Sequence, residues 1–261
     1  MRLGGAVATG VAVVLTGCIY YNAIYNAERL LEEGDALRRA GRDSLATDRY
    51  LEVIRKASGG FREDPDGEWA GPALLLIGRA HLGLGDLRAA RAALERADQV
   101  GRDEQVRLAS RLYLGATVLD GGDADGAMGL LDEAVAGLAP GRLLAEAHLW
   151  RGRARLAAGD AAGGAQDLAA AATMDPGLGL AAELETVRSG LEHDDRARVR
   201  AAMSRLLALP EGGELFDSVA GLTRRAEDAW GAADAADLLA GLDGSRWSPA
   251  PRSRLRLVRA E

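Results

Sequence analysis

The chain has 261 residues and a formal net charge of −7, and only 4% of its residues are aromatic. An acidic chain with scattered basic residues lacks the dense positive surface that nucleic-acid binding requires, so we expect no nucleic-acid partner. Alanine and leucine, which favour helices, dominate the composition, whereas β-branched residues are sparse after the N-terminal segment. This composition predicts an all-α protein.

The first 17 residues are organised like a secretory signal peptide. Arg2 is their only charge, an apolar stretch runs from about Gly4 to Leu15, and small residues stand at Thr16 and Gly17. A short charged region, an apolar region and a small-residue cleavage site are typical of such peptides. The apolar stretch is shorter than the roughly 20 residues that a membrane-spanning helix needs. We therefore expect residues 1–17 to be removed.

Cys18 follows this segment and is the only cysteine in the chain, so it cannot form an intramolecular disulfide. The sequence Leu15-Thr16-Gly17-Cys18 resembles the lipobox of bacterial lipoproteins at all four positions. The resemblance implies cleavage before Cys18 and attachment of lipid to its sulfur and to the new amino terminus. Several acyl chains anchor a protein stably, whereas a single chain gives marginal binding. The alternative is a buried cysteine in an ordinary N-terminal helix.

Residues 18–26 would then form the lipidated anchor segment. The tyrosines of this segment suit the membrane interface, but they would equally serve as a hydrophobic cap on the first helix. Ile19, rather than aspartate, follows the cysteine. Under the sorting rule of the lipoprotein family, this residue implies the periplasmic face of the outer membrane. We therefore expect a lipid-anchored protein of the cell envelope, with the membrane as one partner.

An internal repeat organises the remaining sequence. Gly78, Gly115 and Gly152 lie 37 residues apart. Each is followed at fixed spacings by a Gly-Asp pair, a small residue, a leucine and an alanine. These residues are Gly85-Asp86, Ala90, Leu94 and Ala97; Gly122-Asp123, Ala127, Leu131 and Ala134; and Gly159-Asp160, Gly164, Leu168 and Ala171. Apolar residues spaced three and four apart on both sides of a glycine turn predict a helix hairpin.

This pattern resembles the tetratricopeptide repeat (TPR). Ile77-Gly78 and Leu114-Gly115 match the Leu-Gly pair of the family, whereas Arg151-Gly152 departs from it. Two outer copies of the repeat are weaker. In the last of them, Asp194-Asp195 replaces the Gly-Asp turn.

The resemblance implies an all-α, right-handed superhelical solenoid of about five TPR-like helix hairpins over residues 27–209. The repeats are expected to start near residues 27, 71, 108, 145 and 180. A capping helix pair is expected over residues 210–243, and a basic, disordered tail over residues 244–261.

The interval between the first two repeats is lengthened to about 44 residues by the segment 58–68. Glycine, proline and charged residues predict that this segment is a loop. It would either present Phe61 and a cluster of carboxylates to a partner or be a tolerated surface insertion.

In TPR proteins, the first helices of the repeats line a concave face. The resemblance places the fifth and twelfth positions of the repeats on this face, with the ninth position beside them. The residues expected to line a partner-binding groove are Leu31, Leu75, Arg79, Leu82, Leu112, Leu119, Leu149, Arg153, Leu156, Leu184, Arg188 and Leu191. An apolar floor flanked by arginines would suit an amphipathic helix or an extended peptide with acidic residues. Alternatively, these leucines pack between adjacent repeats and leave little exposed surface.

We predict no catalytic, metal or cofactor site. His81, His148 and His193 are far apart in the chain and lack clustered ligands at metal-binding spacing. Asp123 and Asp125 partly imitate a calcium loop, but they belong to a repeat turn. We find neither a nucleophile elbow nor a phosphate-binding Gly-Lys-Ser loop.

The sequence therefore predicts a membrane-anchored TPR scaffold that mediates protein–protein interactions in the bacterial cell envelope. Outer-membrane protein assembly and pilus or secretion systems use lipoproteins of comparable build. An envelope enzyme and a purely structural spacer are the alternatives.

Overall fold

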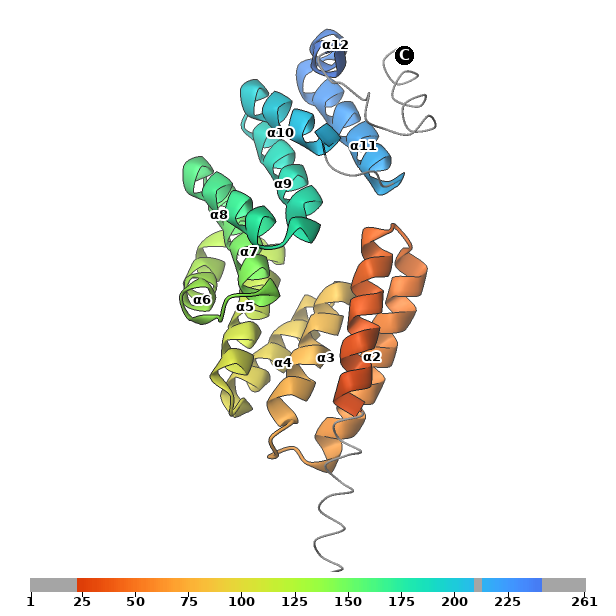
Figure 1. Cartoon of the computed structure of the whole chain (residues 1–261), viewed down its shortest axis with the longest axis vertical. Helices are drawn as coiled ribbons and strands as arrows, with labels where there is room; N and C mark the ends of the chain where they lie inside the picture. Colours follow the sequence, from red (N-terminus) through yellow and green to blue (C-terminus); the bar gives the residue numbers. More distant parts are fainter. Residues whose placement is uncertain (1–22, 209–212, 241–261) are drawn as a thin grey trace, which may run out of the picture. The chain divides into compact units, whose positions relative to one another are not determined.

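The computed structural model describes residues 23–208 and 213–240, and every regular element in these ranges is helical (Figure 1). The predicted signal peptide, Cys18, most of the anchor segment and the basic tail lie outside the described residues. None of the described helices is long and apolar enough to cross a membrane.

The helices follow one another as antiparallel pairs, as the sequence predicts. A helix over residues 23–39 pairs with α2, and five further pairs follow it along the chain. The helices are α2 (Asp43–Glu63), α3 (Ala70–Leu84), α4 (Leu87–Val100), α5 (Glu104–Asp120), α6 (Ala124–Gly137), α7 (Arg142–Ala157), α8 (Ala161–Met174), α9 (Gly179–Glu192), α10 (Arg196–Ala208), α11 (Gly213–Trp230) and α12 (Ala232–Ala240), with a short 3₁₀ turn at Pro176–Leu178.

Each of the first five hairpins turns at a residue with positive φ. Glycine takes this position in four hairpins, and Asp194 takes it in the fifth with a φ of 53°. The aspartate after the turn caps the second helix in four hairpins by accepting a hydrogen bond from a backbone N–H, which stabilises the helix start. These caps are Asp86 to Ala89, Asp123 to Gly126, Asp160 to Gly163 and Asp195 to Arg198. The Asp194-Asp195 turn is therefore confirmed.

Small residues allow the two helices of a hairpin to pack closely. A Cβ atom added to Gly115 on α5 would lie 2.8 Å from Cγ of Leu131 on α6. Leu131 is fully buried, and Leu94 and Leu168 occupy the matching places in the neighbouring hairpins. The repeat glycines therefore leave the space that the repeat leucines fill, as the sequence predicts.

The prediction of a loop over residues 58–68 is wrong for its first half. Helix α2 continues through Ser58 to Glu63, and only residues 64–69 form a connection. The buried Gly60 and the core contacts of Phe61 hold the extra turns in place, so Phe61 is not presented by a loop. Packing of this face outweighs the low helix propensity of the two glycines.

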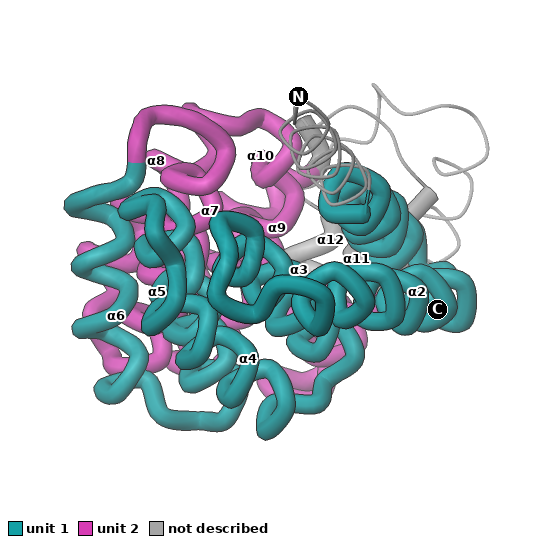
Figure 2. The backbone as a smooth tube through the Cα atoms, turned by 90° about the horizontal axis from the view of Figure 1, so that it is seen from below, with its two compact units in different colours: residues 1–138 teal, residues 139–261 magenta. Residues whose placement is uncertain are grey.

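The chain divides into two compact units, residues 1–138 and residues 139–261 (Figure 2). Unit 1 contains the helices from residue 23 to α6. One of its clusters is built around Tyr50, Val53 and the buried leucines of the first helices. Unit 2 contains α7 to α12. One of its clusters lies around Leu168, and another lies around Met203 and Leu206.

Candidate protein-binding groove

The residues predicted to line a groove lie on the first helices of the hairpins. In unit 1 these are the helix over residues 23–39, α3 and α5, and in unit 2 they are α7 and α9. Helix α3 contacts α5, and α7 contacts α9, so within each unit the first helices of adjacent hairpins lie side by side.

Four of the predicted groove leucines are buried core residues. Leu31 is 1% exposed and Leu112 is fully buried in unit 1, and Leu149 and Leu156 are buried in unit 2. Their side chains fill the space between helices and are not accessible to a partner in this structure. These four leucines therefore fit the alternative interpretation, in which they pack between repeats, and they do not offer a surface for partner contact.

The other five leucines keep part of their surface exposed. These are Leu75, Leu82 and Leu119 in unit 1, and Leu184 and Leu191 in unit 2. Leu75 also packs against the core of unit 1, and Leu184 and Leu191 pack against the core of unit 2. Leu82 and Leu119 lie in the last turns of α3 and α5, next to the hairpin turns. The apolar surface available to a partner is therefore narrower than the sequence suggests.

Arg79 takes part in a network that joins three hairpins of unit 1. Its Nη2 donates a hydrogen bond of 3.4 Å to Asp35, and its guanidinium lies 4.4 Å from the ring centroid of Tyr113. Tyr50 donates a hydrogen bond of 2.9 Å to the other oxygen of Asp35. Burial and the adjacent Asp35 carboxylate raise the pKa of Tyr50, so it stays a neutral donor.

Arg153 and Arg188 are likewise neutralised within unit 2. Nε of Arg153 lies 3.1 Å from a carboxylate oxygen of Glu185, and its guanidinium lies 4.1 Å from the ring centroid of Trp150. Arg188 pairs with the other oxygen of Glu185. All three predicted groove arginines thus have carboxylate partners from the chain itself. An acidic peptide would have to compete with these partners, which argues against strong selection for acidic residues.

The groove face of unit 1 also carries acidic groups. Burial, assisted by the nearby Glu32, raises the pKa of Glu28, and the charge of Arg79 offsets part of this effect. Glu28 and Glu32 therefore add acidic charge beside the Arg79–Asp35 pair. Together with the partly exposed leucines, this charge suits an amphipathic segment without excess acidic residues.

A buried polar cluster between α7 and α8 is missing from the sequence prediction. Asp167, 3% exposed, receives two hydrogen bonds from Arg151, of 2.8 Å and 2.7 Å. Nδ1 of His148 lies 2.7 Å from the same carboxylate, and Arg155 pairs with it at 2.8 Å. Burial by itself would raise the pKa of Asp167, but the hydrogen bonds from Arg151 and His148 outweigh it and lower the pKa.

The sequence contained a signal for this cluster. Arg151 occupies the repeat position that Ile77 and Leu114 occupy in the preceding hairpins, where both are buried. A charged residue at a buried repeat position requires a counter-charge on the facing helix, which Asp167 supplies. The cluster replaces an apolar contact by an ionic one, so its role is in packing.

The histidines have separate surroundings. His148 belongs to the Asp167 cluster, Nδ1 of His193 lies 2.9 Å from the carbonyl oxygen of Ser189, and His81 lies 3.7 Å from Asp86. Over the described ranges, no three His, Cys, Asp or Glu side chains are grouped as a metal site would require.

No protein-family model and no curated protein sequence matches the chain. Among solved structures, PilW, described as a widely conserved type IV pilus biogenesis factor, is similar with a TM-score of 0.56 and 14% identity. The match covers 88% of this chain and 98% of PilW. PilF from Pseudomonas aeruginosa is similar with a TM-score of 0.50 and 12% identity, covering 90% of this chain and 99% of that chain. At these identities the likeness establishes the fold, which is TPR-like, with helices in sequential antiparallel pairs.

Proposed function

We propose that this chain is a lipid-anchored TPR adaptor of the bacterial cell envelope, which binds a protein partner and acts in type IV pilus assembly. The observation that supports it most is the combination of the lipobox-like sequence Leu15-Thr16-Gly17-Cys18 with a fold that matches PilW over 98% of the length of PilW. The proposal places the adaptor on the periplasmic face of the outer membrane. Outer-membrane protein assembly and secretion are the neighbouring candidates.

The geometry supports binding of a protein segment. Each unit presents adjacent first helices with partly exposed leucines on a framework whose buried positions are filled. The arginines beside these leucines are held by ion pairs and by stacking on aromatic rings, so the face needs little ordering before it binds. A preorganised face of this kind lowers the entropic cost of association.

The anchor is tested by labelling and fractionation. Cells that express the wild-type chain should incorporate labelled palmitate into it and retain it in the membrane fraction. The Cys18→Ser variant should incorporate none. Palmitate labelling of the serine variant, or normal processing without any lipid, would refute the anchor.

The assembly role is tested by deletion in the native cell. Loss of the chain should reduce surface pili, counted by electron microscopy, and the wild-type gene should restore them. Crosslinking from detergent-solubilised membranes should recover a stoichiometric partner. If the recovered partner is instead the β-barrel assembly machinery and pili are normal, the pilus role is wrong while the adaptor role stands.

The binding face is tested by matched leucine truncations in unit 1. Leu82→Ala and Leu119→Ala remove partly exposed side chains and should weaken recovery of the partner while leaving the melting temperature nearly unchanged. Leu112→Ala removes a fully buried side chain and should cost about 2–5 kcal/mol of stability. Intact partner recovery in the Leu82 and Leu119 double variant would exclude this face.

A further inference from the structure

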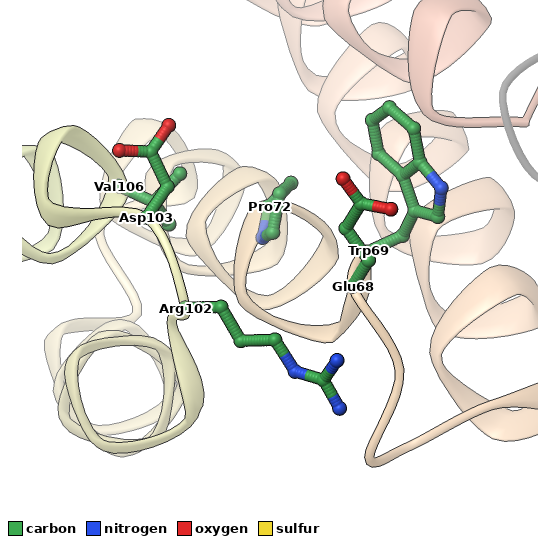
Figure 3. A pocket seen from close by; sticks show the side chains of 6 residues that line it. All are labelled: Glu68, Trp69, Pro72, Arg102, Asp103 and Val106. Carbon is green, nitrogen blue, oxygen red and sulfur yellow. The ribbon is translucent and has the colours of Figure 1, made fainter.

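The connection that lengthens the first repeat builds a surface depression of about 550 Å³ in unit 1. It lies where α3 and α5 begin, at the connections between repeats. Figure 3 shows Glu68, Trp69 and Pro72 on the side of α3, and Arg102, Asp103 and Val106 on the side of α5. None of these residues belongs to the predicted groove.

Close backbone contact fixes the floor of the depression. A Cβ atom added to Gly71 would lie 2.8 Å from Cα of Gly101 and 3.3 Å from Cγ1 of Val106, so a glycine at position 71 permits this close approach. The contact brings Pro72, which follows Gly71, beside Val106, and both of these apolar side chains are partly exposed. The floor is therefore apolar and formed by packed backbone.

Hydrogen bonds fix the rim. Arg102 donates a hydrogen bond of 2.6 Å to the carbonyl oxygen of Asp66, which ties the connection after α2 to the connection before α5. Asp103 caps α5 by accepting a hydrogen bond of 2.9 Å from the backbone N–H of Gln105. The rim is thus held at both ends of the depression.

The charge of the rim is negative. Glu68 and Asp103 are exposed carboxylates, and Glu68 has no ion-pair partner among the described residues. The guanidinium of Arg102, the one basic group of the lining, is directed to a backbone carbonyl. Asp64 and Asp66 add further exposed negative charge on the same connection.

We propose that this depression binds an arginine or lysine side chain of a basic segment in a partner protein. The long stem of such a side chain packs along Pro72 and Val106 while its charged end meets Glu68, a division that amphipathic side chains favour. Trp69 lines the depression next to Glu68, so its indole N–H resonance reports on this end of the depression. The lengthened connection is then a second contact point, separate from the groove, and the proposal does not depend on the groove.

The test is an NMR titration of the unlipidated mature chain, residues 18–261 with Cys18→Ser. The probe is the peptide acetyl-Ala-Leu-Arg-Leu-Arg-Ala-amide, and the matched control replaces both arginines with neutral citrulline. The arginine peptide should shift the indole N–H resonance of Trp69, assigned through Trp69→Phe, and the citrulline peptide should not. Equal binding of the two peptides would overturn the proposal.

Two variants distinguish binding in the depression from general electrostatic attraction to the acidic surface. Glu68→Gln should weaken peptide binding about threefold, the effect of one exposed ion pair. Glu63→Gln, which removes the same charge from the end of α2 outside the lining, should change binding much less. Equal losses in both variants would indicate diffuse attraction and would refute a defined site.

Two further outcomes identify other occupants or faces. Binding that is lost in Leu82→Ala would assign the peptide to the groove and overturn the proposal. A Trp69 resonance that shifts when residues 252–261 are deleted, without any peptide, would make the basic tail of the chain itself the occupant. The proposed partner contact is supported if neither change occurs.

Discussion

At the scale of single residues, Asp194 occupies the turn position at which the four preceding hairpins have a glycine. It adopts a φ of 53°, a conformation that glycine takes at the corresponding turns at lower steric cost. We expect Asp194→Gly to raise the free energy of unfolding by about 1 kcal/mol, measured by urea denaturation. At the corresponding turn of the preceding hairpin, Gly159→Ala should lower the free energy of unfolding by a similar amount, because Gly159 has a φ of 85°. A destabilised Asp194→Gly variant would contradict this account.

Asp167 should contribute to stability as a buried counter-charge. Asp167→Asn leaves Arg151 and Arg155 without their carboxylate, and loss of one partner from a buried ion pair costs about 3 kcal/mol. Thermal unfolding at neutral pH measures this loss. Arg196, whose ion pair with Asp234 is half exposed, offers the control: Arg196→Gln should change stability by less than about 1 kcal/mol.

The Asp167 cluster also predicts that the stability of the fold depends on pH in the acid range. The folded-state pKa of Asp167 is lowered, so its contribution is present above the unfolded pKa of about 4 and is lost as the pH falls through the folded pKa. The difference in melting temperature between wild type and Asp167→Asn should therefore be present at about pH 5 and shrink below about pH 4. A difference that grows on acidification would reverse the sign and refute the lowered pKa.

At the scale of elements, the close contact between paired helices sets which positions tolerate a side chain. In the hairpin of α5 and α6, a Cβ at Gly115 would press on Leu131, whereas a Cβ at Gly129 would meet no atom within 4 Å. We expect Gly115→Val to cost about 2 kcal/mol through overpacking. Gly129→Val should change stability by less than about 0.5 kcal/mol. If chemical denaturation gave equal stability changes for the two variants, helix propensity and not the contact with Leu131 would determine the cost.

The hairpins were predictable from sequence because their determinants are local. The turn, the capping aspartate and the small-residue contact each depend on residues within one repeat, and their spacing recurs three times. The extension of α2 to Glu63 was not predictable, because Gly59 and Gly60 disfavour a helix locally and contacts with the core override that preference. Tertiary packing decided this boundary.

The exposure of the groove residues was predicted less well than the hairpins, for a related reason. Leu112 and Leu119 both recur at repeat positions expected on the concave face, but Leu112 is fully buried while Leu119 is partly exposed. Burial at these positions depends on how α3, α4 and α6 pack around α5, which no single repeat encodes. The partners of Arg79 and Arg153 were missed because Asp35 and Glu185 lie in neighbouring repeats.

At the scale of the whole molecule, the proposed anchor and the helical fold depend on different parts of the sequence. The hairpins contain no cysteine, and their stability comes from buried leucine, alanine and glycine contacts. Under the proposed function, the lipid on Cys18 supplies location only. Tethering to the membrane of the partner raises the effective concentration there, without adding any contact.

This division predicts that protein concentration can replace the anchor. An unlipidated form, made by exchanging residues 1–17 for a cleavable secretory signal and introducing Cys18→Ser, should keep the wild-type melting temperature. At native expression it should fail to restore surface pili in deleted cells. Overexpression by about 10- to 100-fold should restore them, because a higher free concentration offsets the lost tether. Full activity at native expression would show that the anchor is dispensable. Failure at every expression level would show that the lipid does more than determine location.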